Sequence, residues 1–270
     1  MGEKSGVTLN PAIPWPKDPK SNLRWVLLGI FLLLVFGWSA EGTNLSISEL
    51  VRGYPGLVDI VSRMFPPSLE AIPRLIDPSL ETIQISIWGT TLAIIMAIPI
   101  GLTAARNISP HPAIYQFSRF ILSAARSINE IVFALVFVAA VGLGPFPGVL
   151  ALACHSVGML GKFLADSIEH TDPGPLEALK ATGANKWQVI AYAVIPQIMP
   201  EFVNLCLYRW EINFRSATTL GIVGAGGIGF ELISSMRLFM YHDMTTIVLV
   251  IFLTVTAVDS ISSYVRSRII

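Results

Sequence analysis

The chain has 270 residues, of which 53% are hydrophobic and only 13% are charged, and its mean hydropathy is +0.65. A soluble domain carries about a quarter charged residues, so this composition excludes an ordinary soluble protein and indicates a polytopic membrane protein. The formal net charge is zero, which gives no support for a nucleic-acid partner. Cys154 and Cys206 lie in apolar runs without metal-type spacing, so we interpret them as buried hydrophobic residues and predict no metal site.

The first part of the chain divides into three segments. Residues 1–22 are polar and proline-rich, which predicts a disordered cytoplasmic tail. Residues 23–40 are almost entirely apolar and predict the first transmembrane helix. A signal peptide is the alternative, but its charged region would be unusually long and no cleavage site stands out. Residues 41–79 are mixed and rich in proline, which predicts an extracytoplasmic segment with an amphipathic stretch, 50–64, along the membrane face.

Residues 80–270 contain several further apolar runs. Together with the N-terminal run they predict an all-α, polytopic membrane protein with about six transmembrane helices. Lysine and arginine are concentrated in the loops that this arrangement places inside, so the positive-inside rule predicts that both termini are cytoplasmic. The further predicted spans are 80–105, 113–141, 148–168, 193–220 and 244–265.

A polar segment, 172–196, lies between two of these spans and carries its own helix signals. Asp172 can cap a helix that begins at one of the prolines after it, and Gly183 supplies the left-handed residue that ends this helix. Asn185 can cap a second helix through a capping box, until Pro196 breaks or kinks the chain. The sequence therefore predicts a helix, a tight corner and a second helix on the cytoplasmic side.

One side of the first of these two helices is apolar. Leu176 and Leu179 lie three residues apart and form a small apolar surface, whereas Glu177 and Lys180 lie on a polar edge. A helix this short is not stable alone, so it must dock against another surface. The pattern alone leaves two interpretations, a connector packed on its own protein or a segment that docks on a partner.

The spacing of this segment resembles the cytoplasmic coupling signature of bacterial ABC importer permeases. In that signature Glu-Ala-Ala, three residues and Gly are followed, nine residues later, by Ile-x-Leu-Pro. The chain keeps Glu177, Ala178, Gly183 and Pro196 at these positions. It differs from the signature at Leu179, Ala193 and Ile195, which are all apolar residues. In the family the segment inserts into a groove on the ATPase subunit, so the resemblance implies a set of ATPase-coupling residues: Leu176, Glu177, Ala178, Leu179, Gly183 and Pro196.

Charged residues also occur at membrane depth, where an unpaired charge is costly. Arg126 and Glu130 lie four residues apart and can pair on one helical face, and Glu211 and Arg215 can pair in the same way. Arg209 is two residues from Glu211 and cannot pair with it by this spacing. Either these residues form internal ion pairs that hold the helices together, or an arginine among them lines an anion path. The candidate set is Arg126, Asn129, Glu130, Arg209, Glu211 and Arg215.

A glycine-rich run at 221–229 contains the spacing Gly-x-Gly-x-x-Gly. This spacing indicates dinucleotide binding only between a strand and a helix of a soluble domain, which this sequence does not predict. We therefore reject nucleotide binding and expect close helix packing and a bend at the end of a span, or part of a gate. The glycines concerned are Gly221, Gly224, Gly226, Gly227 and Gly229.

The chain also resembles the permeases of phosphonate import systems. The resemblance covers roughly residues 80–270, and Asn129 stands where proline is expected. Residues 1–79 match no motif of that family. The resemblance implies a type I ABC importer permease core, 80–270, with a cytoplasmic coupling-helix loop. The stretches that carry it are 126–145, 148–153, 158–162 and 213–229.

This family resemblance implies an assembly in the bacterial inner membrane. A homodimeric pore would lie in the lipid bilayer, with two ATPase subunits beneath it and a periplasmic solute-binding protein above it. The chain has no Gly-x-x-x-x-Gly-Lys-Ser/Thr phosphate loop, so ATP and magnesium would be bound by the partner ATPase and this chain would be neither an enzyme nor a cofactor carrier. Phosphonate, phosphite and phosphate-like oxyanions all match buried arginines, and the sequence does not choose among them.

Three alternatives stay open on the sequence alone. A permease for another small solute, such as methionine, would share the coupling motif and the number of helices. A membrane-embedded enzyme could use Glu130, His155 and Asp166 as acid and base, although they match no catalytic spacing and His155 is better explained as a hydrogen-bonded packing residue. A passive anion channel would leave the coupling segment without a role.

Overall fold

The computed structural model of the chain describes residues 19–43 and 46–269. Most of the predicted cytoplasmic tail, residues 1–18, lies outside the described residues. The chain divides into two units, Met1–Asp59 and Ile60–Ile270. Every regular element within the described residues is a helix, so the predicted all-α fold is confirmed.

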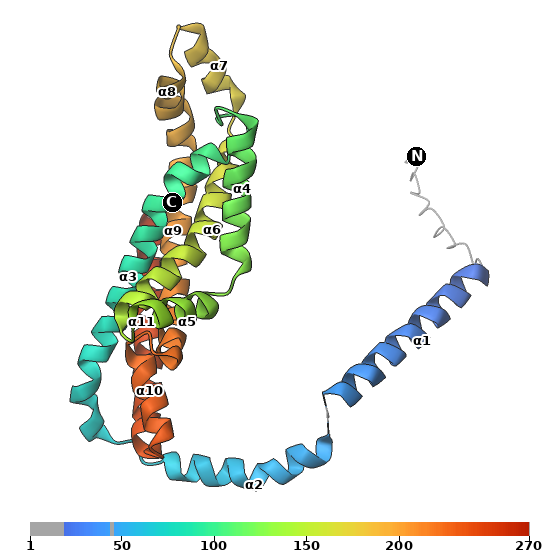
Figure 1. Ribbon diagram of the computed structural model, residues 1–270, viewed down its shortest axis with the longest axis vertical. Coiled ribbons are helices and arrows are strands. Elements are labelled where there is room, and N and C mark those ends of the chain that lie inside the picture. Colours follow the sequence, from blue (N-terminus) through green and yellow to red (C-terminus); the bar gives the residue numbers. More distant parts are fainter. Residues whose placement is uncertain (1–18, 44–45, 270) are drawn as a thin grey trace, which may run out of the picture. The chain divides into compact units, whose positions relative to one another are not determined.

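The first unit contains α1 (Pro19–Gly42) and most of α2 (Ile47–Met64) (Figure 1). α1 includes the predicted first span, and its apolar stretch Arg24–Gly42 has no buried residue within the chain. An apolar helix that buries nothing in its own protein is suited to contact with lipid. α2 coincides with the predicted amphipathic stretch and also buries no residue. Its apolar side chains recur at helical spacing: Ile47, Leu50, Val51, Tyr54, Leu57, Val58 and Val61.

The second unit is a bundle built around α3 (Ile72–Thr103) and α6 (Pro145–Glu169). Small residues let these two helices approach closely, and a Cβ atom on Gly89 would lie only 2.8 Å from the Cβ of Leu152. The main cluster of buried apolar side chains lies along this contact. It includes Ala93, Ala97, Leu122, Leu160, Leu164 and Ile198.

α3 begins earlier than the sequence predicts. The predicted span starts at residue 80, whereas the helix begins at Ile72, directly after the 3₁₀ turn η1 (Leu69–Ala71). Pro73 lies in the first turn, where a missing N–H group breaks no intrahelical hydrogen bond. Pro78 lies inside the helix, so proline content was a poor guide to where this helix starts. The helix therefore extends the span into the segment predicted as extracytoplasmic.

The third predicted span, 113–141, is not one continuous helix. It is divided into α4 (Pro112–Ser127) and α5 (Glu130–Val141), which are bent by 91° relative to each other (Figure 1). The predicted span is therefore interrupted, and the expectation of one helical face through Arg126 and Glu130 is wrong. The run has no proline between the two halves, but Arg126, Asn129 and Glu130 interrupt it at the break. Asn129 is a residue type that caps helix starts, so the sequence held one local signal that the predicted span did not use.

The break itself is stabilised by side chains that satisfy freed backbone groups. Ile128 is extended, with φ −90° and ψ 126°, and the Asn129 side chain accepts a hydrogen bond of 2.9 Å from the Ile131 N–H group. The Nδ1 atom of His155, on α6, lies 2.9 Å from the carbonyl oxygen of Ile128. Backbone groups at membrane depth need such partners, so His155 is part of what makes the break tolerable.

After α6 the chain forms the predicted polar segment and then two further long helices. Within the described residues, five helical stretches are long and apolar enough to cross a membrane, and the α4–α5 pair gives a sixth if it forms one broken span. α7 and α8 lie at one end of the second unit, and the junction of α10 and α11 lies at the other (Figure 1). The elements are α7 (Pro173–Ala181), α8 (Lys186–Val189), the π-helical turn η2 (Ile190–Val194), α9 (Ile195–Leu220), the 3₁₀ turn η3 (Gly221–Val223), α10 (Ile228–Arg237) and α11 (Tyr241–Ile269).

Candidate coupling segment and membrane-depth charges

The predicted corner between two short helices is present. The Asp172 side chain accepts a hydrogen bond of 3.0 Å from the Gly174 N–H group at the start of α7. At the other end, Gly183 has φ +83°, its N–H group donates to Lys180, and the next N–H group donates to the carbonyl oxygen of Leu179. This pair of bonds is a Schellman motif, which requires a left-handed residue. Local sequence signals therefore fix the shape of this corner.

The second half of the segment is also capped as predicted. Asn185 and Gln188 form a reciprocal capping box, with bonds of 2.9 and 2.8 Å, at the start of α8. The predicted kink at Pro196 takes the form of a π-helical turn, after which Pro196 lies in the first turn of α9. Gln197 accepts a bond of 2.9 Å from the N–H group of Asp172, so α9 is tied directly to the start of α7.

The predicted coupling residues face two directions. Leu176 is half-buried against the main apolar cluster of the bundle, whereas Glu177 and Ala178 are exposed. The apolar surface predicted from Leu176 and Leu179 therefore packs partly on the chain's own bundle. Gly183 and Pro196 are exposed, and two large side chains that the sequence analysis did not single out are more prominent. Trp187 is 75% exposed and Tyr192 is 74% exposed.

Trp187 and Tyr192 had a sequence signal that could have been used. Both are large aromatic residues in a polar connector predicted to lie in the cytoplasm, where exposed aromatic side chains mark interaction surfaces. Trp187 also lines a small pocket of about 350 Å³ between α8 and the loop after α3. The end of the bundle that carries α7 and α8 thus offers a partner both exposed aromatic groups and a concave surface.

An arginine with all three nitrogen atoms bonded anchors the bundle near this segment. Arg119, on α4, donates to Asp166 and to Glu169 on α6, each at 2.8 Å. Its Nε atom donates to the carbonyl oxygen of Ala104, at the end of α3, also at 2.8 Å. Glu169 accepts a further bond of 2.7 Å from the N–H group of Arg106. Charge-assisted bonds of this kind are strong, so α3, α4 and α6 are held together at this end.

A second ion-pair cluster joins α9 and α11. The predicted pair Glu211 and Arg215 is present, and Arg215 also contacts Asp259 at 3.2 Å. Arg266 contacts the other carboxylate oxygen of Glu211 at 3.0 Å. Two carboxylates therefore balance two guanidinium groups, which fits the interpretation of Glu211 and Arg215 as internal ion pairs. The partners on α11 could not be predicted, because nothing in the sequence gives contacts between helices so far apart.

The predicted pair Arg126 and Glu130 does not form. The break between α4 and α5 separates the two residues, so they do not share a helical face. Glu130 instead accepts a bond of 2.9 Å from the Ser216 hydroxyl group and lies 3.5 Å from Nε2 of His155. Arg126 is exposed at the end of α4 and has no ion-pair partner among the residues that the structure describes.

Arg209, in α9, is held by a chain of buried hydrogen bonds. Its Nε atom donates to the Ser156 hydroxyl group at 2.9 Å, and Ser156 donates to the Asn213 side chain at 3.0 Å. The amide nitrogen of Asn213 donates in turn to the Thr90 hydroxyl group at 2.9 Å. Arg209 is only 4% exposed, and Ser156 and Asn213 are fully buried. The side chain is therefore fixed by residues of α3, α6 and α9.

The positive charge of Arg209 has no direct counter-ion. Its Nη1 atom contacts the sulfur of Met159 at 2.9 Å, and no carboxylate forms an ion pair with it among the described residues. An arginine at the centre of a membrane helix costs about 2.5 to 3.5 kcal/mol on insertion scales. Arg209 thus differs from Arg119 and Arg215, whose charges are balanced by carboxylates in direct contact.

The glycine-rich run forms a tightly packed turn. Gly224, Gly226 and Gly227 all have positive φ, and a Cβ atom on Gly229 would lie 1.8 Å from the carbonyl oxygen of Thr218. Gly221 is also crowded, because a Cβ atom on it would clash with the backbone nitrogen of Phe230 in α10. The N–H groups of Gly227 and Ile228 donate to the side chains of Glu81 and Thr82, so the turn is bonded to α3. This geometry agrees with the predicted close helix packing and bend. The alternative, that the run is part of a gate, stays a prediction.

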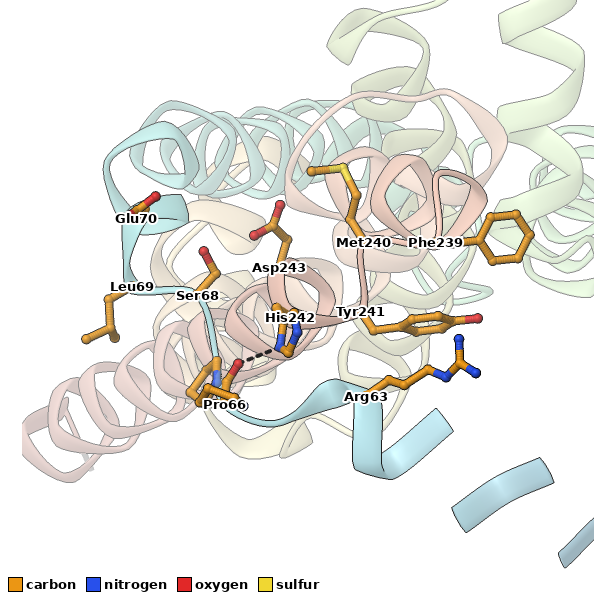
Figure 2. Close-up of a pocket in the computed structure, with 11 residues that line it drawn as sticks. Arg63, Pro66, Ser68, Leu69, Glu70, Phe239, Met240, Tyr241, His242 and Asp243 are labelled. Carbon is orange, nitrogen blue, oxygen red and sulfur yellow. Dashed lines mark hydrogen bonds between the residues drawn. The ribbon is translucent and has the colours of Figure 1, made fainter. Parts of the chain in front are cut away.

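A wide cavity of about 820 Å³ lies at the end of the second unit opposite α7 and α8. Figure 2 shows its two walls, the segment from Arg63 to Glu70 and the segment from Phe239 to Asp243. The two walls are bonded to each other, since His242 lies 2.7 Å from the carbonyl oxygen of Pro66 (dashed in Figure 2) and the Thr245 hydroxyl group donates to Met64 at 2.7 Å. These hydrogen bonds between the two walls therefore hold the shape of the cavity.

The sequence matches the family of binding-protein-dependent transport system inner membrane components over residues 97–270. It is 45% identical over 224 residues to the phosphite transport system permease protein PtxC of Stutzerimonas stutzeri, which covers 83% of this chain and 82% of that protein. It is 44% identical over 189 residues to the phosphate-import permease protein PhnE of Mycolicibacterium smegmatis, which covers 70% of this chain and 36% of that protein.

Solved structures share the fold. A chain of the MetNI methionine ABC transporter in an inward-facing conformation superposes with a TM-score of 0.64 and 17% identity, over 75% of this chain and 99% of that chain. At this identity the likeness shows the fold alone, which is the predicted importer permease fold. The relatives confirm the resemblance to permeases of the phosphonate and phosphite type. The chain therefore belongs to the family of binding-protein-dependent transport system inner membrane components.

Proposed function

We propose that this chain is the transmembrane permease subunit of an ATP-driven importer that carries phosphite, a phosphonate or a related oxyanion across the inner membrane. The observation that carries the proposal is the likeness to the phosphite permease of Stutzerimonas stutzeri along most of both chains. The capped corner between α7 and α8 supports it, because such a corner has no evident use in a passive channel.

In this proposal α7 and α8 dock on a separate ATPase subunit, which binds ATP and magnesium. The exposed groups of the corner, Glu177, Ala178 and Trp187, would form the contact. Closure of the ATPase subunits would move the corner as a rigid body, since both helices are capped and α9 is bonded to the start of α7. The ion pairs of Arg119 would pass this movement to α3, α4 and α6.

The proposal includes a second copy of the chain in the membrane. Arg215 and Asp259 lie at membrane depth with half-exposed side chains, and the neighbouring surface of α11 is a row of hydroxyl groups. Polar side chains are costly in contact with lipid tails, so this face is suited to contact with a second subunit. The row comprises Thr256, Ser260, Ser263, Tyr264 and Ser267.

A periplasmic solute-binding protein would deliver the oxyanion at the opposite end. The cavity beside His242 and Asp243 is the shaped surface there and offers a place for its attachment. This orientation makes both termini cytoplasmic and places residues 41–79 largely on the periplasmic side, in line with the distribution of basic residues.

The experiment that tests the proposal is co-purification of the chain in detergent with the ATPases encoded beside it, followed by measurement of vanadate-sensitive ATP hydrolysis. We expect stable capture, and we expect Glu177→Ala to reduce capture or hydrolysis. Glu201→Ala is the matched control, because Glu201 is an exposed carboxylate of α9 outside the coupling corner. Anion flux through the reconstituted chain alone, without capture of any ATPase, would replace the proposal with a passive channel.

A further inference from the structure

We infer that Arg209 and the break between α4 and α5 form a site inside the membrane that holds one tetrahedral oxyanion during its passage. The inference rests on the proposed function and assigns the place where the transported ion is bound. It depends on three features of the structure: an arginine without a counter-ion, a fixed orientation of that arginine, and a broken helix beside it.

The first feature is the set of free donors on Arg209. Its Nε and Nη1 atoms have partners, whereas Nη2 has none among the described residues. Every fully buried side-chain nitrogen and oxygen in the described part of the chain has a hydrogen-bond partner. The unbonded Nη2 atom therefore keeps some accessible surface, although the Arg209 side chain as a whole is buried. Met159, which flanks the guanidinium group, is 38% exposed and marks the direction of access.

The second feature is preorganisation. The chain of bonds from Arg209 through Ser156 and Asn213 to Thr90 fixes the guanidinium group before any ligand arrives. A planar guanidinium group that keeps donors free matches the oxygen atoms of a phosphite or phosphonate group. Arg119, which joins three helices, differs in having a bonded partner on each of its three nitrogen atoms.

The third feature is the broken helix. His155 and Ser156 are neighbours on α6, and His155 contacts Ile128 at the break while Ser156 contacts Arg209. The start of α5, a helix of 12 residues, is thus linked to Arg209 through two adjacent side chains. Helix starts at membrane depth carry partial positive charge and point at anionic substrates in transporters with discontinuous helices. Here the buried Arg209 adds a full positive charge to the partial positive charge of the helix start.

The same geometry explains why the ion would be held only briefly. Glu130 lies at the start of α5, is bonded to Ser216 and is close to His155. Its negative charge offsets part of the field of Arg209, so an anion is attracted without being trapped. A transport site needs this balance, because binding must be strong enough for entry and weak enough for release.

The test uses the purified complex of the chain with its ATPase subunits, in nanodiscs of phosphatidylcholine. Retention of radiolabelled phosphite is measured for the wild type, Arg209→Gln and Arg209→Lys, together with ATP hydrolysis. We expect Arg209→Gln to assemble and hydrolyse ATP, with phosphite retention about ten- to a hundredfold weaker, the factor for loss of a charged hydrogen-bonded partner. Arg209→Lys should recover part of the retention, because it keeps the charge and loses the planar donor group.

Arg215→Gln is the matched control, since Arg215 is an arginine of the same helix whose charge is already balanced. It is expected to lower thermal stability and to leave phosphite retention within about twofold of the wild type, as for a site that does not touch the ligand. Normal retention by Arg209→Gln, equal loss in Arg215→Gln, or no retention by the wild type would overturn the inference. If Arg209→Gln does not assemble, normal retention by Arg209→Lys would overturn it equally.

Two further outcomes distinguish the oxyanion site from a lipid-binding site and from a failure of the proposed function. Displacement of phosphite by phosphatidylglycerol added to the nanodiscs would assign the site to a lipid headgroup and overturn the assignment to the transported ion. Failure of the wild type to capture an ATPase would refute the proposed function itself. Capture and hydrolysis without retention that depends on Arg209 would refute only the intramembrane site.

Discussion

The corner between α7 and α8 gives a sharp test of coupling, because a substitution at Gly183 changes backbone energy alone. Gly183 has φ +83°, and no atom lies within 4 Å of a Cβ atom placed on it. A side chain there meets open space, so its only cost is the left-handed conformation. That cost is about 1–2 kcal/mol for an ordinary residue and is much smaller for asparagine, which is found at this position in natural helix ends.

A cost of 1–2 kcal/mol corresponds to a factor of about 5–30 in the population of the native corner. We therefore expect Gly183→Val to lower ATP-driven uptake of phosphite by proteoliposomes by up to this factor, and Gly183→Asn to keep most of it. Captured ATPase and ATP hydrolysis are measured in the same preparations. Equal uptake by the two variants, or normal uptake by Gly183→Val, would refute the argument that the shape of the corner sets coupling.

Three further predictions follow from named contacts. Trp187→Ala should weaken capture of the ATPase by about 2 kcal/mol, the size of an interface hot spot, and unchanged co-purification would exclude Trp187 from the contact. Gly229→Ala places a Cβ atom 1.8 Å from the Thr218 oxygen and should cost at least about 1–3 kcal/mol in thermal unfolding, whereas Gly37→Ala meets nothing within 4 Å and serves as the control. Arg119→Met should cost about 1.5–3 kcal/mol per lost charged bond and Arg119→Lys less; equal melting temperatures for both and the wild type would contradict a structural role.

The parts of the fold that depend on local signals were predictable from the sequence. The cap at Asp172, the capping box at Asn185 and the left-handed Gly183 all involve bonds between residues a few positions apart. Such bonds depend on residue type and spacing, which the sequence states directly. The same holds for the apolar runs, because the thickness of the bilayer alone sets the length that a span requires.

The break between α4 and α5 was not predicted, because it depends in part on a contact between distant residues. The run 113–141 contains no proline near the break and has apolar residues on both sides of it, which favours one helix, although Asn129 is a possible helix cap. The structure instead has an extended Ile128 whose carbonyl oxygen lies beside His155, a residue of another helix. The predicted pair of Arg126 with Glu130 failed for the same reason, since it required a continuous helix.

The partners of the other charged residues also include distant residues that the sequence could not predict. The spacing of Glu211 and Arg215 predicted one pair correctly, but Asp259 and Arg266, which complete the cluster, lie on α11. For Arg209 the sequence could say only that no partner lay at helical spacing. The structure adds that its bonded partners are the neutral residues Ser156 and Met159. Because neither balances its positive charge, Arg209 is a candidate anion site.

The corner between α7 and α8, which we propose couples transport to the ATPase, is connected to the proposed anion site by α6 and α9. α6 carries Ser156 and, at the end nearer to α7, Glu169, which is paired with Arg119. α9 carries Arg209 and, within its first turn, Gln197, which is bonded to Asp172 at the start of the corner. Because helices transmit displacement as rigid bodies, a shift of the corner changes the position of Arg209 relative to the break. An importer needs this linkage, since hydrolysis at one end must alter how an ion is held at the other.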